Sequence, residues 1–280
     1  MRVIEEASVV VATVPAVFAS VEESAAARQA VIFDWTDLWS SAASTFEGQG
    51  MASFGARTQA ARWRKRERTL SRAPVARTFA GFADAETLLG VRGGDSWLPT
   101  PVTGHTRCAP QPEMAGGRRL GFIANLHYAP NRISLDKFLG DFGARLSGIG
   151  SRLVVAGPGS AEVDDPFGVV EPLGVVRRVE DFYQSIDAAV VPVEVGGGIK
   201  VKAIEALAHG VPVYGTRHVA EGFPPSLRPH ISSLETLFDA THVPSMMPSE
   251  VWSSYFSVSA FNAGVARAVS VAGAARREVD

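Results

Sequence analysis

Residues 188–216, AAVVPVEVGGGIKVKAIEALAHGVPVYGT, decide the fold of this 280-residue chain. They begin with an apolar run over Ala188–Val193, and such a run is typical of a strand buried on both faces of a parallel sheet. Three glycines follow at Gly196–Gly198, and the pattern then predicts a helix over Lys200–Ala208. Gly210 stands where a glycine commonly ends a helix. The stretch therefore predicts a strand, a glycine turn and a helix, followed by a second strand.

This arrangement has the chemistry of a nucleotide site. A glycine turn that opens a helix points backbone N–H groups at one spot, and the helix dipole makes that spot positive. Gly197 and Gly198 let a phosphate approach without an intervening Cβ, and Lys200 and Lys202 add positive charge. One turn into the helix, Glu205 can accept two hydrogen bonds from a diol such as a ribose. The alternative is a structural turn in which Glu205 pairs with Lys202 or Lys200.

Strand-length apolar runs alternate with helical segments along the rest of the chain. The predicted strands are Ser8–Val14, Ala30–Asp34, Val75–Gly81, Leu120–Leu126, Arg152–Ala156, Ala188–Val193 and Val211–Gly215, with a further short one near Trp97–Pro101. The other predicted helices are Gly55–Ser71, Leu135–Ser147 and Val179–Ser185, and a last helical region covers Ser249–Arg276. This order predicts an α/β fold with doubly wound parallel sheets.

The composition excludes several classes of protein. The formal net charge of -2, from 27 basic and 29 acidic side chains, gives no overall attraction to nucleic acid. Cys108 is the one cysteine, so no internal disulfide forms, and we expect a cytoplasmic protein. The apolar stretch Ala7–Ala19 is similar to a signal-peptide core, but Glu5 and Glu6 precede it, which favours a buried strand.

A proline- and glycine-rich stretch, Gly93–Gly117, predicts a linker between two domains. We therefore expect a domain boundary near residue 110, with a first domain over residues 1–110 and a second over residues 111–249. Residues 250–280 are expected to form a C-terminal helical segment, with Ser257 as the N-cap of its last helix.

The helix and the strand after it resemble glycosyltransferase family 4, the group 1 transferases. The residues that match the family pattern A-[ML]-A-x-G-x-P-V and the glutamate before it are Glu205, Ala206, Leu207, Ala208, Gly210, Pro212 and Val213. Gly197 stands where the usual E-x7-E pattern has its first glutamate, so the chain resembles the branch with a G-G-G-x-[RK] loop. The segments Arg152–Gly159 and Pro172–Val175 are also similar to family loops.

The resemblance implies the GT-B fold, in which two Rossmann-like domains face each other, with a shortened N-terminal domain because few strands precede residue 110. It implies transfer of a sugar from a nucleoside diphosphate sugar to a glycan, lipid-linked or small-molecule acceptor. Retention of configuration, no bound metal and no further cofactor are implied as well. The implied nucleotide-sugar contacts are Gly157, Val175, Gly197, Gly198, Ile199, Lys200 and Glu205. No catalytic side chain is identified.

Further contacts to phosphate or acceptor are expected after two strands. Asn125 stands in the place of the family's arginine, and Arg132 or Lys200 substitutes for its lysine. His127 is either a loop residue or such a contact. Asp34 and Asp37 follow a strand of the first domain, on the acceptor side of the cleft, or they cap a helix beside core tryptophans.

Two further expectations concern the surface and the chain's end. Arg57–Arg72 carries seven basic side chains against Glu67, which indicates a solvated helix face anchored by Trp63 and Leu70. The alternative is a peripheral contact with anionic lipid at the inner face of a membrane. The resemblance implies that the last helix packs back on the first domain. The alternative function is a non-catalytic nucleotide-sugar-binding or partner subunit. A sugar-nucleotide epimerase shares this fold, but it should carry paired carboxylates and histidines in the cleft, and the sequence does not indicate such pairs.

Overall fold

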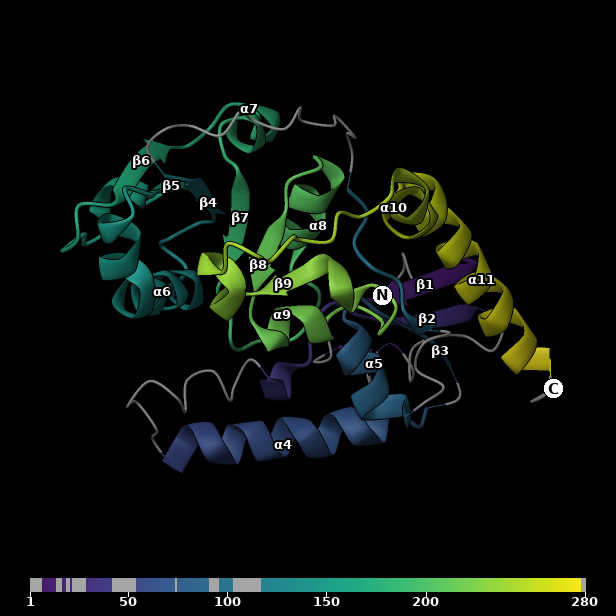
Figure 1. Cartoon of the computed structure of the whole chain (residues 1–280). Helices are drawn as coiled ribbons and strands as arrows, with labels where there is room; N and C mark the ends of the chain where they lie inside the picture. Colours follow the sequence, from purple (N-terminus) through teal and green to yellow (C-terminus); the bar gives the residue numbers. More distant parts are fainter. Residues whose placement is uncertain are drawn as a thin grey trace.

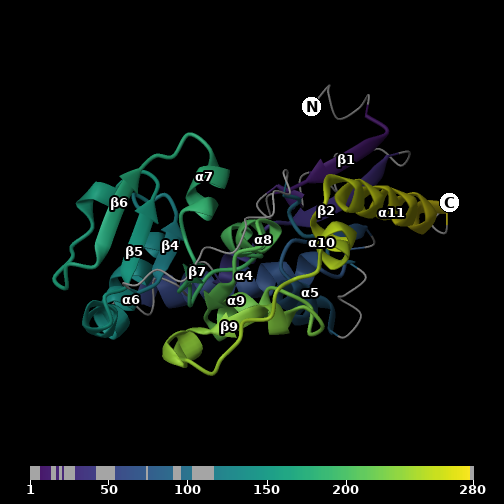
Figure 2. The same ribbon diagram turned by 45° about the horizontal axis from the view of Figure 1, so that its top comes forward.

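The computed structural model describes residues 7–13, 17–18, 21, 29–41, 54–73, 75–90, 96–102 and 117–277. These residues form two parallel sheets, one of three strands and one of six, which lie beside each other with helices packed around them (Figures 1 and 2). The predicted α/β class with parallel sheets is therefore confirmed.

The first sheet has the order β1-β2-β3, with β1 (Val9–Ala12), β2 (Ala30–Trp35) and β3 (Ala76–Phe79) all parallel. The long helix α4 (Phe54–Leu70) connects β2 to β3, and α5 (Phe82–Leu89) follows β3. One face of the sheet buries an aromatic cluster, in which the ring of Trp35 stacks on that of Phe79 at 5.8 Å. The run that resembled a signal-peptide core thus contains a strand of this sheet.

The opposite face of the first sheet is covered by the end of the chain. After α10 (Ser249–Phe256), helix α11 (Val258–Arg277) lies along β2 and β3, although it is last in the sequence (Figure 1). Its Ala268 and Ala272 pack on Ile32 and its neighbours in the sheet. Ser257 accepts the N–H of Ala260 at 3.1 Å, as an N-cap does. The expected boundary near residue 110 and most of the linker lie outside the described residues.

The second sheet has the order β6-β5-β4-β7-β8-β9, and all its pairs are parallel. Its strands are β4 (Arg119–Ile123), β5 (Arg152–Ala156), β6 (Val170–Gly174), β7 (Ala188–Val191), β8 (Val213–Gly215) and β9 (Ile231–Ser233). The first three strands run from β4 at the centre of the sheet to β6 at one edge. The next three run from β7, beside β4, to β9 at the other edge. In such a doubly wound sheet, the carboxyl ends of the two central strands open a crevice where ligands bind.

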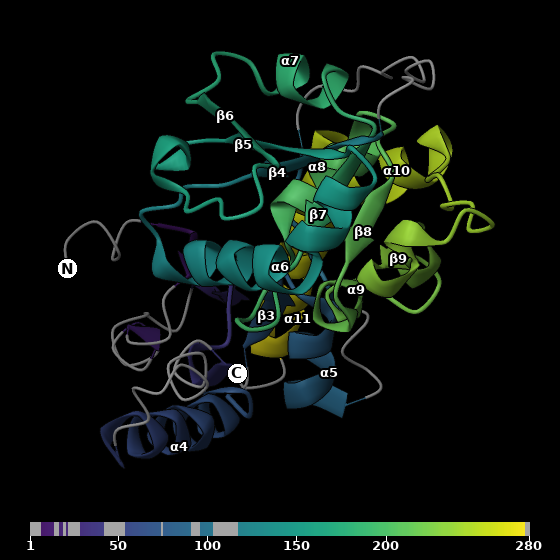
Figure 3. The ribbon, with the colours of Figure 1, turned by 60° about the vertical axis from the view of Figure 1, so that its left-hand side comes forward.

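Helices cover both faces of the second sheet. Helix α6 (Ala129–Gly148) packs on one face, whereas α7 (Val179–Gln184) and α8 (Val201–Ala208) pack on the other (Figure 3). The remaining helical segments are η3 (Ser160–Glu162), α9 (Arg217–Glu221), η4 (Arg228–His230) and η5 (Leu234–Phe238). Within the described ranges, no helix is both long and apolar enough to cross a bilayer.

The structure differs from the predicted elements in three respects: short elements that were missed, the start of one helix, and one predicted strand that is only a bridge. Strands β6 and β9 and helix α5 were not predicted, because they are short and carry polar or exposed side chains that break an apolar pattern. Helix α6 begins at Ala129 rather than Leu135, because Pro130 fits its first turn. Instead of a strand near Trp97–Pro101, Trp97 forms a single parallel bridge with Phe79.

Candidate functional site

A cleft of about 240 Å3 opens at the carboxyl ends of β4 and β7, where the order of the second sheet reverses. One wall follows β4 and includes Tyr128 and Asn131, and the other is the loop between β7 and α8. Asp37, which follows β2 of the first sheet, also lines it. The full lining consists of Asp37, Tyr128, Pro130, Asn131, Val193, Val195, Gly196, Gly197, Ile199, Lys200 and Lys202. The cleft therefore lies between the two halves of the fold.

The glycine loop has its shape because it packs closely on the first half. Gly198 has φ of +70°, and a Cβ there would lie 2.6 Å from the carbonyl oxygen of Thr36. A Cβ on Gly197 would lie 2.6 Å from the backbone nitrogen of Leu38. No side chain fits at either position without movement of the backbone, so these glycines are required by packing as well as by any ligand.

The backbone N–H groups of this loop differ in whether the protein supplies an acceptor for them. Gly197, Ile199 and Lys200 donate no backbone hydrogen bond to another described residue, and all three line the cleft. The N–H of Gly198 instead donates to Oδ2 of Asp84 at 2.6 Å. A carboxylate of the other half therefore accepts the N–H of Gly198 in this structure, and a nucleotide contact at Gly198 stays a prediction.

Lys200 carries the positive charge nearest to these donors. Lys200 is half-buried, and its Nζ donates to the carbonyl oxygen of Gly197 at 2.5 Å. Burial lowers the pKa of Lys200, and the carboxylates of Asp37 and Asp84 oppose that shift. The ammonium group is thus held against the loop, with two carboxylates close by.

Lys202 adds a second cation on the same side of the cleft. Its Nζ donates to Oδ1 of Asn131 at 3.2 Å and lies 4.6 Å from the centre of the Phe122 ring. Burial, reinforced by repulsion from Lys200, lowers the pKa of Lys202 to about 8. The side chain therefore remains mostly protonated at neutral pH and joins α8 to the first turn of α6.

Glu205 does not form either predicted lysine pair. The hydroxyl of Tyr183 donates to its Oε2 at 3.2 Å, and the Tyr183 ring stacks on that of His209. Burial raises the pKa of Glu205, and the hydrogen bond from Tyr183 opposes the shift. Glu205 lies one turn further along α8 and is not part of the lining of the cleft. A ribose contact at Glu205 stays a prediction.

Asp84, in the first turn of α5, is the residue that the sequence reasoning missed. Only 7% of it is exposed. Burial raises its pKa to about 6, while the N–H of Gly198 and the charge of Lys200 oppose the shift, and the carboxylates of Asp37 and Glu67 reinforce it. The sequence did contain one indication of this role: Asp84 follows the predicted strand Val75–Gly81, and an acidic residue just after a parallel strand lies at the carboxyl edge of its sheet.

The two acidic candidates of the first sheet have different surroundings. Thr78 on β3 donates its hydroxyl to Oδ1 of Asp34 at 2.6 Å, and burial raises the pKa of Asp34. Trp35 is fully buried, as the core interpretation expected. Asp37 lines the cleft, where loss of solvent raises its pKa and Lys200 opposes the shift. Of the pair, Asp37 is therefore the one that faces a ligand space.

The three candidates after β4 make local contacts. The Oδ1 of Asn125 accepts the N–H of His127 at 3.0 Å, and His127 lies 3.6 Å from a carboxylate oxygen of Glu162. Arg132 pairs with Asp136 at 3.0 Å and does not line the cleft. Of the two residues expected to substitute for the family's lysine, Lys200 lies at the cleft, and a phosphate contact at Arg132 stays a prediction.

Gly157 and Val175 follow neighbouring strands of the second sheet. The N–H of Gly157 donates to the carbonyl oxygen of Gly174 at 2.7 Å. With φ of +115° and the carbonyl group of Ala124 against it, Gly157 has no room for a Cβ. Val175 is 71% exposed just after β6. Packing alone thus accounts for Gly157, and Val175 offers an open apolar surface.

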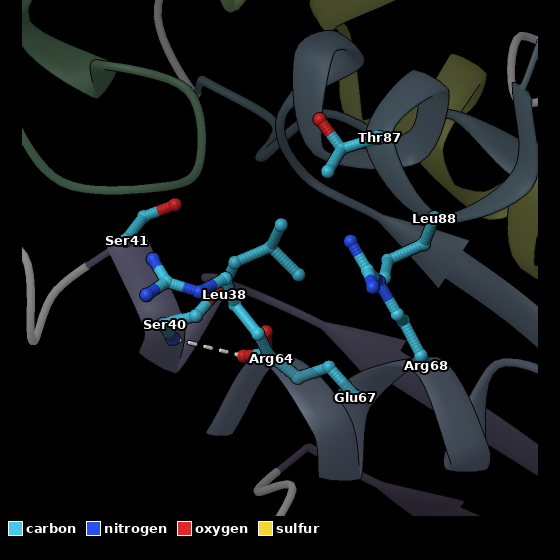
Figure 4. A pocket seen from close by; sticks show the side chains of 8 residues that line it. All are labelled: Leu38, Ser40, Ser41, Arg64, Glu67, Arg68, Thr87 and Leu88. Carbon is cyan, nitrogen blue, oxygen red and sulfur yellow. Dashed lines mark hydrogen bonds between the residues drawn. The ribbon is translucent and has the colours of Figure 1, made fainter. Parts of the chain in front are cut away.

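Helix α4 carries the predicted basic stretch. Trp63 packs edge-on against Trp39 at 4.4 Å and Leu70 is buried, so the predicted anchors of the helix are confirmed. Glu67 is 1% exposed and accepts the N–H of Ser40 at 3.0 Å (Figure 4). A pocket of about 170 Å3 beside it is lined by Leu38, Ser40, Ser41, Arg64, Glu67, Arg68, Thr87 and Leu88 (Figure 4).

Residues 117–238 match a protein-family model described as Glycosyl transferases group 1. No curated protein sequence matches the chain. Among solved structures, the chain is similar to HepE from Anabaena in complex with UDP and glucose, with 12% identity, a TM-score of 0.57, and coverage of 96% of this chain and 80% of HepE. Residues 117–238, which match the family model, form the second sheet with its helices and include the glycine loop.

Two other solved structures share the arrangement. TarM is 12% identical, with a TM-score of 0.51 and coverage of 96% of this chain and 51% of TarM. The lipopolysaccharide outer core galactosyltransferase WaaB is 12% identical, with a TM-score of 0.52 and coverage of 90% and 77%. This chain therefore spans about half the length of TarM. At such identities the likeness shows the fold, which is GT-B, with two Rossmann-like halves.

Proposed function

We propose that this chain transfers a sugar from a nucleoside diphosphate sugar to an acceptor. One observation carries the proposal: the cleft at the switch point of the second sheet is lined by a glycine loop, the start of a helix and a half-buried lysine, and by Asp37 from the first half of the fold. The family match over residues 117–238 supports it, as does the structure of HepE, which was solved with UDP and glucose.

The diphosphate fits best against the donors that the protein leaves unused. The N–H groups of Gly197, Ile199 and Lys200 and the ammonium of Lys200 would bind its oxygens. Lys202 would add a second charge at the wall. As the bond to the sugar breaks, negative charge develops on the leaving diphosphate, and these groups stabilise it. Transfer without a metal, with retention of configuration, is part of the proposal.

The other predicted contacts complete this assignment. Glu205 would accept hydrogen bonds from the ribose, and Gly157 and Val175 would border the base. Asp37, from the first half, would face the sugar or the acceptor across the cleft. The acceptor is a glycan, a lipid-linked sugar or a small molecule, and the exposed cations of α4 would approach anionic lipid if it is lipid-linked. The resemblance of the glycine loop supports the further proposal that the chain is of the branch that lacks the first family glutamate.

The test is titration calorimetry with UDP, ADP and GDP. We expect one of them to bind, and Lys200→Met to weaken it at least tenfold, because a charge-assisted contact is worth about 1.5–3 kcal/mol. Lys137→Met is the matched control, since Lys137 is an exposed lysine that pairs with Glu194 and Asp141. Absence of binding by all three nucleotides would refute the proposal. If one nucleotide binds but is not released from its own sugar conjugates, the non-catalytic alternative is favoured.

A further inference from the structure

The two halves of the fold meet at the glycine loop through a small set of contacts. The N–H of Gly198 donates to Asp84 at 2.6 Å, and the N–H of Phe82 donates to the carbonyl oxygen of Gly222 at 3.0 Å. Further out, Glu86 on α5 forms an ion pair with Arg228 at 3.7 Å. The start of α5 therefore lies directly against the loop that opens α8.

The residues before α5 pack against the glycine loop so closely that a side chain at Gly81 has no room. A Cβ on Gly81, which precedes α5, would lie 2.9 Å from the Cα of Gly198 and 2.9 Å from the Oδ2 of Asp84. Contacts below 3.0 Å require something to move, and here much of what would move is backbone. The carboxylate of Asp84 is thus fixed both by its own burial and by the loop that it contacts.

We infer that Asp84 is a positioning residue for the phosphate site: by accepting the N–H of Gly198 it fixes, from the opposite half of the fold, the loop that binds the nucleotide. The inference rests on the proposed function. It adds that the donor site is incomplete without a side chain of the first half, and that Asp84 itself makes no contact with the nucleotide.

The physical reason is the freedom of a run of three glycines. Glycine loses more conformational entropy on ordering than any other residue, so an unanchored loop would pay that cost when the nucleotide binds. A charged acceptor is among the strongest partners for a backbone N–H. Gly197 and Ile199, on either side of Gly198, line the cleft, and their N–H groups donate to no described residue, so holding Gly198 fixes the segment that carries these unused donors.

The experiment measures by calorimetry the affinity for UDP, replaced by ADP or GDP if the parent binds one of those instead, and it measures hydrogen exchange of a peptide that spans the loop. Asp84→Ala should weaken UDP about tenfold and speed exchange at Gly198, since a charged hydrogen bond is lost. Asp84→Asn should stay within about threefold of the parent, because its amide oxygen still accepts that N–H. Glu86→Gln is the matched control, since it removes a carboxylate of α5 and an ion pair between the halves without touching the loop.

Two results would overturn the inference: Asp84→Ala binding UDP as the parent does, or unchanged exchange at Gly198. If Asp84→Ala does not fold, Gly81→Ala tests the same contact, because its Cβ pushes Gly198 away, and it should weaken UDP as well. If the parent protein binds no nucleoside diphosphate, the proposed function is refuted. The exchange measurement then still decides whether Asp84 holds the loop.

Discussion

Replacing Asp84 with asparagine should change how the stability of this protein depends on pH. Burial raises the pKa of Asp84 from 3.8 to about 6 in the folded state. Between these two values the unfolded chain has released the proton and the folded chain still holds it. Raising the pH through this window therefore destabilises the folded protein, and the loss is complete above the folded pKa.

The size of the effect follows from the shift. A difference of about two pKa units, at 1.36 kcal/mol each, gives about 3 kcal/mol between pH about 4 and pH about 7. Asparagine cannot ionise, so Asp84→Asn lacks this loss. The free energy of unfolding of the variant, minus that of the parent, should rise by about 3 kcal/mol across the window. Groups that titrate alike in both proteins cancel in this difference.

The assay is urea denaturation followed by tryptophan fluorescence, repeated at several pH values, with Glu86→Gln as the control for removing one charge from the same helix. If the free energy of unfolding of Asp84→Asn minus that of the parent stays constant across the pH window within about 0.5 kcal/mol, Asp84 ionises in the folded protein as it does in the unfolded chain. The argument from burial would then fail. A difference that falls with pH would mean that attraction to Lys200 outweighs desolvation.

Three further outcomes are expected. Gly198→Ala should lower the free energy of unfolding by about 1–3 kcal/mol more than Gly168→Ala, because both have positive φ but only Gly198 lacks space for a Cβ; equal losses in urea denaturation would contradict this. Glu205→Ala should weaken UDP about ten- to a hundredfold without unfolding the protein, and unchanged affinity by calorimetry would remove the ribose assignment. Ala272→Asp buries an unpaired charge under the first sheet and should cost about 2–4 kcal/mol in urea denaturation, whereas exposed Ser270→Asp should cost little; similar losses would show that α11 does not pack there.

The sequence was sufficient for the parts of the fold that depend on neighbouring residues. Unbroken apolar runs such as Ala188–Val193 predicted central parallel strands, since both faces of these strands are buried. Glycines between a strand and a helix predicted the loop at Gly196–Gly198, and Ser257 predicted the start of the last helix. Edge strands such as β6 were missed, because their exposed side chains leave no such pattern.

Only the tertiary structure decided which side chains meet at the loop. Asp84 lies 114 residues from Gly198, and no local pattern specifies that a carboxylate of one sheet takes an N–H of the other. Lys202 at the start of α8 likewise donates to Asn131 at the start of α6, although the two residues are 71 positions apart in the sequence. Local propensity depends on residues a few positions apart. The contact between Lys202 and Asn131 depends instead on how the second sheet is wound, and the contact between Asp84 and Gly198 depends on how the two sheets pack together.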